Sequence, residues 1–150
     1  MPSKFNRRGG FKVFTPIYRS GLEDTIALQL EEQGVPKVYE KYKISYTIPS
    51  SQHLYTPDFI LPNGIIIEAK GIFEAQDRQK HLLIKQQHPN LDIRFVFSNI
   101  KTKIYPGSKT TVATWCEKHG FKYANKSIPP SWFKETMKDT SGLTLKGGGN

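Results

Sequence analysis

The stretch from Tyr55 to Lys70 reads YTPDFILPNGIIIEAK and contains two strand-forming runs around a tight turn. Two turn geometries compete for it. A two-residue type I′ turn at Asn63 and Gly64 would pair Pro62 with Ile65, although proline has no N–H to donate. A type I turn centred on Pro62 and Asn63, with Gly64 in the left-handed conformation of a G1 bulge, gives each residue its preferred geometry. The sequence therefore predicts a β-hairpin with the second of these turns.

The second turn also sets which side chains of the two strands face each other. It places Asp58 opposite Glu68 and Thr56 opposite Lys70. Two carboxylates directly opposite each other are destabilising, and more so beside the isoleucines of IIIEAK, where water is scarce. One lysine is poorly matched to two carboxylates, whereas a divalent cation suits them, and oxygen ligands select a hard ion such as Mg²⁺ or Mn²⁺. The hairpin predicts a metal site at Asp58 and Glu68, with Lys70 on the same face.

The same residues also have a plain structural interpretation. Glu68 and Lys70 could belong to an ordinary solvated face, with Asp58 a surface residue near the turn. An Asp followed by Glu-x-Lys is a short pattern that occurs in many unrelated proteins, so the pattern alone favours this alternative. The turn register, the apolar neighbours and the basic composition together favour the metal site.

Hydrophobic periodicity predicts the remaining elements. Helical patterns cover residues 21–33, 74–88 and 110–119, and strand patterns cover 38–48, 55–61, 65–70 and 91–97. Helices interleaved with strands in this order predict an α/β fold, with a mixed β-sheet flanked by helices.

Glu23 lies in the first of these helices, within the stripe formed by Leu22, Ile26 and Leu30. Its carboxylate is therefore expected to point toward the body of the protein. Glu23 also follows Ser20 at the spacing of a capping box, which is a sufficient structural reason for an acid there. The residues alone leave open whether Glu23 is a ligand, a base or a cap.

Length and composition indicate one folded domain. The chain has 150 residues, of which 37% are hydrophobic, enough for one core but not for two comfortable domains. We expect a flexible basic arm over 1–17, a folded domain over 18–135 and a disordered tail over 136–150. The sequence shows neither an apolar membrane span nor a secretory segment, so we expect a soluble, intracellular protein. The single cysteine, Cys116, has no zinc-spaced neighbours and is expected to be a reduced packing residue.

The charge points to a polyanionic partner. Lys and Arg total 22 against 13 acidic residues, a net charge of +9 that is spread along the chain. Net charge can also serve solubility alone, and each basic residue can be an ordinary solvated charge. The candidate phosphate contacts are Arg7, Arg8, Arg19, Lys101 and Lys103.

Pro57-Asp58 followed by Glu68-Ala69-Lys70 resembles the PD-(D/E)XK motif of restriction-endonuclease-like nucleases. Further segments between residues 15 and 133 resemble the phage endonuclease I family of Holliday-junction resolvases, and their combination is far more specific than the short motif. They are Arg19-Ser-Gly-Leu-Glu23, Tyr55-Thr-Pro-Asp-Phe59, Leu61-Pro-Asn-Gly64, Lys80-His-Leu-Leu83 and Cys116-Glu-Lys-His-Gly120.

This resemblance implies a restriction-endonuclease-like fold and a homodimer that exchanges segments across a bridging strand at about 43–50. It implies symmetric cleavage of a four-way DNA junction, in the host cytoplasm if a phage encodes the chain. Asp58, Glu68 and the main-chain carbonyl of Ala69 would be metal ligands and Lys70 a catalytic lysine. Glu23 would be a further catalytic and metal-binding acid, supplied by the other subunit.

Two other functions remain open at this stage. One is a nuclease that acts on linear or damaged duplex DNA. The other is a noncatalytic, basic nucleic-acid-binding module that has kept the fold.

Overall fold

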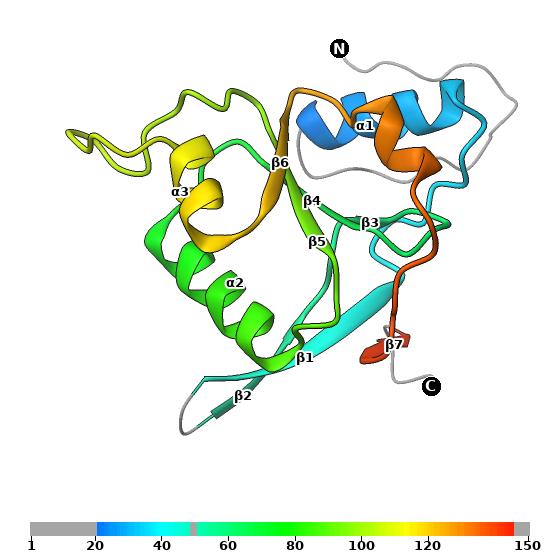
Figure 1. Ribbon diagram of the computed structural model, residues 1–150, viewed down its shortest axis with the longest axis horizontal. Helices are drawn as coiled ribbons and strands as arrows, with labels where there is room; N and C mark the ends of the chain where they lie inside the picture. Colours follow the sequence, from blue (N-terminus) through cyan, green and yellow to red (C-terminus); the bar gives the residue numbers. More distant parts are fainter. Residues whose placement is uncertain (1–20, 49–50, 146–150) are drawn as a thin grey trace, which may run out of the picture.

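The computed structural model describes residues 21–48 and 51–145 (Figure 1). The elements in chain order are α1 Gly21–Glu32, β1 Tyr42–Ile48, β2 Ser51–Tyr55, β3 Phe59–Ile60, β4 Ile66–Lys70, α2 Ala75–Gln87, β5 Ile93–Phe97, α3 Val112–His119, β6 Lys122–Asn125, the 3₁₀ helix η1 Pro130–Lys134 and β7 Leu143–Leu145. The predicted α/β class, with β-sheet flanked by helices, is confirmed. Among the described residues, no helix has the length and apolar character needed to cross a membrane.

The larger sheet has the strand order β3-β4-β5-β6. β3 and β4 are antiparallel, while β4, β5 and β6 are parallel and are joined by crossovers through α2 and α3. α1 and η1 lie on one side of this sheet, with α2 and α3 on the other (Figure 1). One apolar cluster packs α1 against the sheet, and a second packs α3 against Phe95 and Phe97 of β5. Both faces of the sheet are therefore covered, and all of β5 is buried.

The smaller sheet has the order β2-β1-β7 and is antiparallel throughout. Ile44 and Tyr46 of β1 pack with Ile84 of α2 and with Ile66 and Ile93 of the larger sheet. The C-terminal part of the chain was expected to be disordered from residue 136 onward. Within the described residues, Leu143–Leu145 instead form β7, which pairs with β1.

The hairpin turn has the predicted geometry. Gly64 has φ +90°, its N–H donates to the carbonyl of Leu61 at 2.8 Å, and the N–H of Leu61 donates to the carbonyl of Ile65 at 2.8 Å. Ile60 therefore pairs with Ile66, as the type I turn with a G1 bulge requires.

The predicted strand over 55–61 is wrong in one important respect. The run is two strands in two sheets: β2 ends at Tyr55 and pairs with β1, while β3 begins at Phe59 and pairs with β4. Residues 56–58 cross from one sheet to the other. The hairpin ladder ends at Phe59, so the expected cross-strand partners of Asp58 and Thr56 are not formed.

The strand predicted over 38–48 is also shorter than expected. Glu40 has a left-handed backbone with φ +49°, which interrupts an extended run, and β1 begins at Tyr42. Tyr39 forms only an isolated bridge, with Phe59. β6 and β7 were not predicted, whereas the three helices and the strands at 65–70 and 91–97 agree with prediction to within two residues. The proposed Ser20 cap lies outside the described residues.

Arg94 is the largest fully buried polar side chain and joins β5 to the C-terminal segment. It is 0% exposed and makes two-point ion pairs with both Asp92 and Glu135, at 2.7 to 2.8 Å. Its guanidinium carbon also lies 4.9 Å from the ring centroid of Trp132. Because the carboxylates satisfy the buried guanidinium, this network attaches η1 and the residues after it to the sheet.

Candidate active site

Asp58 lies at the crossing between the two sheets. Its carbonyl accepts a hydrogen bond from the N–H of Glu40 at 2.9 Å, and its Oδ2 accepts one from the N–H of Ala69 at 2.9 Å. Beyond Ile67, β3 no longer pairs with β4, so Asp58 reaches the edge of β4 that the short β3 leaves open. The side chain of Asp58 is thus linked to β4 by a hydrogen bond from the backbone N–H of Ala69. Asp58 is not the strand partner of Glu68.

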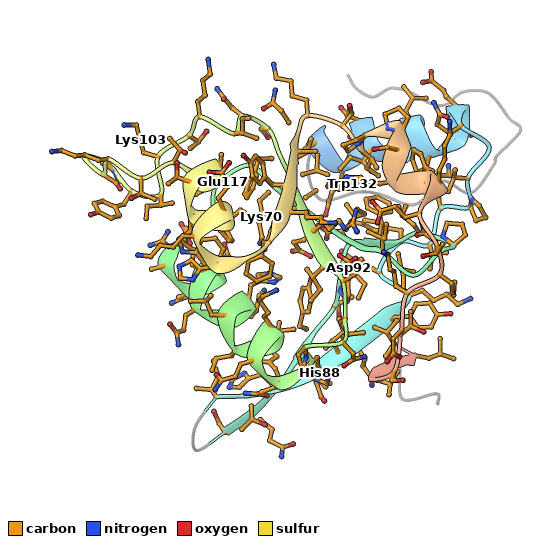
Figure 2. The ribbon with its side chains drawn as sticks, viewed as in Figure 1. Lys70, His88, Asp92, Lys103, Glu117 and Trp132 are labelled. Atoms are coloured by element: carbon orange, nitrogen blue, oxygen red, sulfur yellow. The ribbon has the colours of Figure 1, made fainter. Side chains whose placement is uncertain are left out.

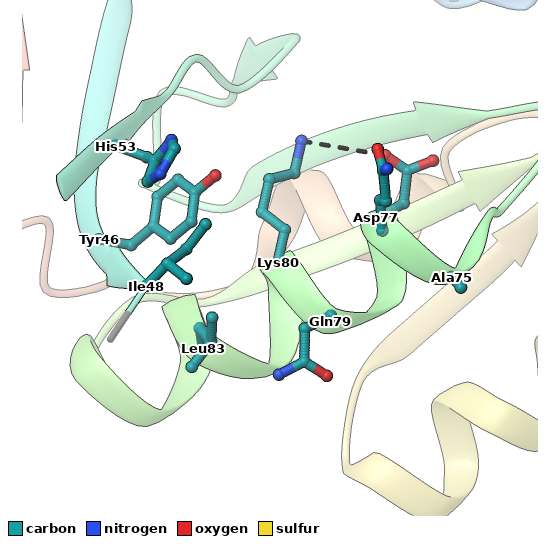
Figure 3. A pocket seen from close by; sticks show the side chains of 9 residues that line it. Tyr46, Ile48, His53, Ala75, Asp77, Gln79, Lys80 and Leu83 are labelled. Atoms are coloured by element: carbon teal, nitrogen blue, oxygen red, sulfur yellow. Dashed lines mark ion pairs between the residues drawn. The ribbon is translucent and has the colours of Figure 1, made fainter. Parts of the chain in front are cut away.

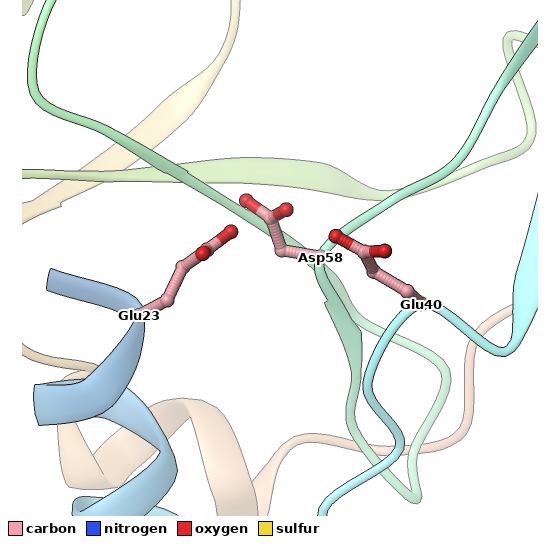
Figure 4. A group of neighbouring side chains, drawn as sticks. All are labelled: Glu23, Glu40 and Asp58. Atoms are coloured by element: carbon pink, nitrogen blue, oxygen red, sulfur yellow. The ribbon is translucent and has the colours of Figure 1, made fainter. Parts of the chain in front are cut away.

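Three carboxylates converge at this point. Glu23 on α1, Glu40 and Asp58 each offer one oxygen, and these oxygens all lie within 4.8 Å of one another. Figure 4 shows the three side chains pointing toward one another from separate segments. Glu23 is 4% exposed and Asp58 is 2% exposed, and the hydroxyl of Tyr39 donates to Glu23 at 3.2 Å. The predicted inward direction of Glu23 is confirmed.

Burial and neighbouring acids raise the pKa of Asp58. Burial is the largest cause, followed by the charge of Glu68, and together with Glu23 they raise the pKa of this carboxyl to about 9. The hydrogen bond from Ala69 opposes the change without cancelling it. A group of carboxylates in this state favours either bound protons or a bound cation.

Glu68 is buried on β4 next to this cluster and has two different neighbours. The hydroxyl of Tyr55 donates to its Oε1 at 2.5 Å, and the ammonium of Lys70 lies 3.6 Å from its Oε2. Burial raises the pKa of the Glu68 carboxyl, against the opposing effects of Lys70 and Tyr55. Burial and the neighbouring Glu68 also raise the pKa of the Tyr55 hydroxyl well above its usual value, so this hydroxyl keeps its proton and serves as a donor.

Lys70 lies near the centre of the molecule, between two acids (Figure 2). Its Nζ is 3.6 Å from Glu68 and 3.3 Å from Oδ1 of Asp77 on α2. Burial lowers the pKa of Lys70, but the two carboxylates outweigh burial and raise it overall. The lysine is therefore held as a cation beside the acidic cluster.

The structure thus brings Glu23, Asp58, Glu68 and Lys70 into one region. It adds Glu40, Tyr55 and Asp77, which the sequence analysis did not single out. Each of these three residues reaches the site through the way separate elements pack together, for which the sequence carries no local pattern.

The two predicted phosphate contacts that the structure describes do not belong to this cluster. Lys101 and Lys103 are exposed on the loop between β5 and α3, and Figure 2 shows Lys103 toward the outer edge of the molecule, away from Lys70. Arg7, Arg8 and Arg19 lie outside the described residues. The predicted packing role of Cys116 is confirmed, because its side chain is buried in the cluster around α3.

The donor set fits a hard divalent cation. All the converging ligand atoms are carboxylate oxygens, and Mg²⁺ and Mn²⁺ prefer such oxygens. An ion of this kind would also remove the repulsion that raises the pKa of Asp58.

Comparison with known proteins identifies relatives of this chain. A family model described as phage endonuclease I matches residues 3–149. The chain is 55% identical to endonuclease I of Escherichia phage T7 over 133 residues, which cover 87% of this chain and 89% of that protein. It is 56% identical to endodeoxyribonuclease 1 of Enterobacteria phage T3 over 122 residues, which cover 81% of this chain and 80% of that one. Because the family model matches nearly the whole length and both relatives are more than half identical over most of their own length, the chain belongs to the phage endonuclease I family.

Proposed function

We propose that this endonuclease cuts four-way DNA junctions by metal-dependent hydrolysis of phosphodiester bonds. The observation that carries the proposal is the buried group of carboxylates beside the Glu68–Lys70 pair. Family membership supports DNA as the substrate, since the relative from phage T3 is an endodeoxyribonuclease. The junction preference rests on the family resemblance. Because both relatives are phage proteins, the proposed place of action is the cytoplasm of the infected host.

Asp58, Glu68 and the carbonyl of Ala69 are the proposed ligands of a first Mg²⁺ or Mn²⁺ ion, and Glu23 with Asp58 the ligands of a second. Bound there, such ions lower the pKa of a coordinated water and neutralise charge that develops on the phosphate. Lys70 is a cation next to the same ligands, so it is placed to orient the attacking water or to offset negative charge in the transition state. The Ala69 N–H holds Asp58 toward β4.

We assign DNA affinity chiefly to lysine and arginine contacts with phosphates. The proposed contacts are Lys101 and Lys103 on the exposed loop, together with Arg7, Arg8 and Arg19. Contacts of this kind release counterions, so junction affinity is expected to fall steeply as salt is added.

The proposed active form is a homodimer that exchanges segments at the bridging strand over 43–50. Glu23 precedes this strand in the chain, and Asp58 and Glu68 follow it. Exchange at that point would therefore supply Glu23 to each site from the partner subunit.

Cleavage is tested on a labelled four-way junction and on its linear arms, with and without Mg²⁺. Glu68→Gln and Lys70→Ala are each expected to bind the junction as the wild type does, while cleavage falls by orders of magnitude. Near-wild-type cleavage by either variant would refute the assigned roles. Equal cutting of junction and linear duplex would refute the junction preference, and binding without any cleavage would identify a noncatalytic module.

Mixed dimers test exchange. A Glu23→Gln subunit paired with an Asp58→Asn subunit contains one intact site if Glu23 is supplied across the dimer, because both defects then fall in the other site. Without exchange, both sites are defective. We expect the mixed dimer to nick one strand of a junction, while each homodimeric variant cuts neither strand. A monomer by sedimentation would contradict the dimer directly.

A further inference from the structure

The catalytic lysine belongs to a closed ring of side-chain contacts. Tyr55 donates to Glu68, Glu68 faces Lys70, and Lys70 lies 3.3 Å from Asp77. Asp77 also lies 4.0 Å from the ammonium of Lys80, and that ammonium returns to the start, 5.0 Å from the ring centroid of Tyr55. The four charged groups alternate in sign along the ring and the neutral Tyr55 closes it, so its members restrain one another.

Two cations would interact with Glu68: the ammonium of Lys70 and a bound divalent ion. Its Oε2 faces the ammonium of Lys70, yet Glu68 is also a proposed ligand of a divalent ion. A bound ion takes up the negative charge of Glu68 and repels the nearby ammonium, both of which weaken the hold of Glu68 on Lys70. A lysine has a long and flexible side chain and would then move away unless another acid retained it.

We propose that Asp77 is the positioning residue that keeps Lys70 at the reaction centre when metal occupies the ligands. This inference rests on the function proposed above. Asp77 suits the role because it contacts Lys70 directly and comes from α2, outside the carboxylate cluster. It acts through Lys70 and does not itself touch the phosphate.

Asp77 can be altered without removing a core side chain. It is partly exposed and, with Lys80, lines an open cavity of about 770 Å³ between α2 and the β1–β2 hairpin (Figure 3). Its Oδ2 accepts a hydrogen bond from the N–H of Glu74 in the capping box of α2. Asn in its place keeps an oxygen for that bond and loses only the charge.

The first measurement separates binding from turnover. Asp77→Asn is expected to bind the junction in Ca²⁺ as tightly as the wild type, while its single-turnover cleavage rate in Mg²⁺ falls about 10- to 100-fold, the usual cost of a misplaced catalytic group. Asp77→Glu keeps the charge and is expected to retain more activity than Asp77→Asn. Glu74→Gln removes a charge from the same capping box and is the matched control, expected to cleave at the wild-type rate.

The second measurement asks whether Asp77 acts through Lys70. If it does, the double variant with Asp77→Asn and Lys70→Ala cleaves no more slowly than Lys70→Ala alone, because both changes remove one shared interaction. A further drop in the double variant would overturn the proposal. So would an equal loss in the Glu74→Gln control, which would identify helix capping as the cause.

The third measurement does not depend on cleavage. The extent of acylation of Lys70 by an amine-reactive reagent, measured by mass spectrometry, reports how accessible the Lys70 amine is to solvent. Mg²⁺ is expected to increase labelling of Lys70 several-fold in Asp77→Asn and to leave the wild type unchanged. If the wild type does not cleave junctions, the proposed function fails; if the wild type cleaves and Asp77→Asn matches it in rate and labelling, only the role of Asp77 fails.

Discussion

Asp58 is a carboxylic acid in surroundings that disfavour its charge. Its pKa of about 9 in the folded chain contrasts with 3.8 in a solvated chain. Between these values, the folded state holds a proton that the unfolded state has lost, so the free energy of unfolding falls as pH rises through this window. Asp58 therefore destabilises the metal-free protein most strongly at the upper end of that range.

Asp58→Asn is expected to raise the melting temperature of the metal-free protein at pH 8. Asn is close to Asp in shape and cannot ionise. The variant therefore avoids the loss of stability that accompanies ionisation of Asp58 as the pH rises. Each 1 kcal/mol gained corresponds to roughly 2–4 °C for a chain of this size. Calorimetry at pH 8 and pH 5 checks the sign, since the gain should shrink toward pH 5. Asp24→Asn, at an exposed position on α1, is the control. A gain in melting temperature for Asp58→Asn that does not change with pH would contradict this explanation.

Tyr55→Phe is expected to weaken the binding of the Mg²⁺ that cleavage requires, and so to raise the Mg²⁺ concentration at which cleavage is half-maximal. The change removes the hydroxyl that holds Oε1 of Glu68 and leaves the ring in the core. Losing a hydrogen-bond partner of a metal ligand typically costs about 10- to 100-fold in metal affinity or activity. The Mg²⁺ concentration for half-maximal cleavage measures it. Tyr46→Phe makes the same chemical change on β1, and an equal effect there would show that the Tyr55 result is not specific to Glu68.

At the residue scale, sequence patterns reached those members of the site that lie in the predicted hairpin. Asp58, Glu68 and Lys70 share one hairpin, and its turn chemistry indicated that they meet. Glu40 and Asp77 could not be found in this way. Glu40 enters through an unusual left-handed backbone, and Asp77 through the packing of α2 beside β4.

At the scale of elements, the turn between β3 and β4 sets the register of the strand that carries Glu68. Gly64 is needed there for two reasons. Its φ of +90° is unfavourable for residues with a side chain, and a Cβ would lie 3.1 Å from the carbonyl oxygen of Lys138. The turn is thus confined by both its own backbone and the C-terminal segment.

Gly64→Ala is expected to lower the free energy of unfolding by about 1–3 kcal/mol, through the left-handed backbone and the added crowding. Denaturant unfolding measures the loss. Gly34→Ala is the matched control, because Gly34 also has positive φ, at +68°, but a Cβ there meets nothing within 4 Å. The difference between the free energies of unfolding lost in Gly64→Ala and in Gly34→Ala measures the contribution of crowding. Equal losses in the two variants would exclude that contribution.

The elements that the sequence missed are short or depend on distant partners. β6 has four residues, KYAN, with no alternation, and its strand character comes from parallel pairing with β5. β7 has three residues and pairs with β1, about a hundred positions earlier. The split of the 55–61 run was missed for a related reason, since the strand pattern of its residues does not reveal that its two ends join different sheets.

At the scale of the whole molecule, α1, α2 and strands of both sheets contribute side chains to the site. The α/β class followed from the order of elements, but the division into two sheets did not. The burial of Arg94 was equally hidden, because its alternating position within strand residues 91–97 did not show that Asp92 and Glu135 would enclose it.

Arg94→Lys is expected to lower the free energy of unfolding by about 1–3 kcal/mol, because an ammonium cannot reproduce the planar fork that serves two carboxylates at once. Thermal unfolding measures the loss. Lys122→Arg exchanges the same two residue types at an exposed position on β6 and should be neutral. A neutral Arg94→Lys would mean that the network does not stabilise the C-terminal segment.

The burial of Arg94 distinguishes its positive charge from the charges of the exposed lysines. Dissolved ions can reach the exposed lysines and screen their charge, whereas the guanidinium stacked on Trp132 is 0% exposed and out of their reach. Concentrated sodium chloride should therefore release bound DNA during purification without unfolding the protein, and the protein should bind DNA again after dialysis.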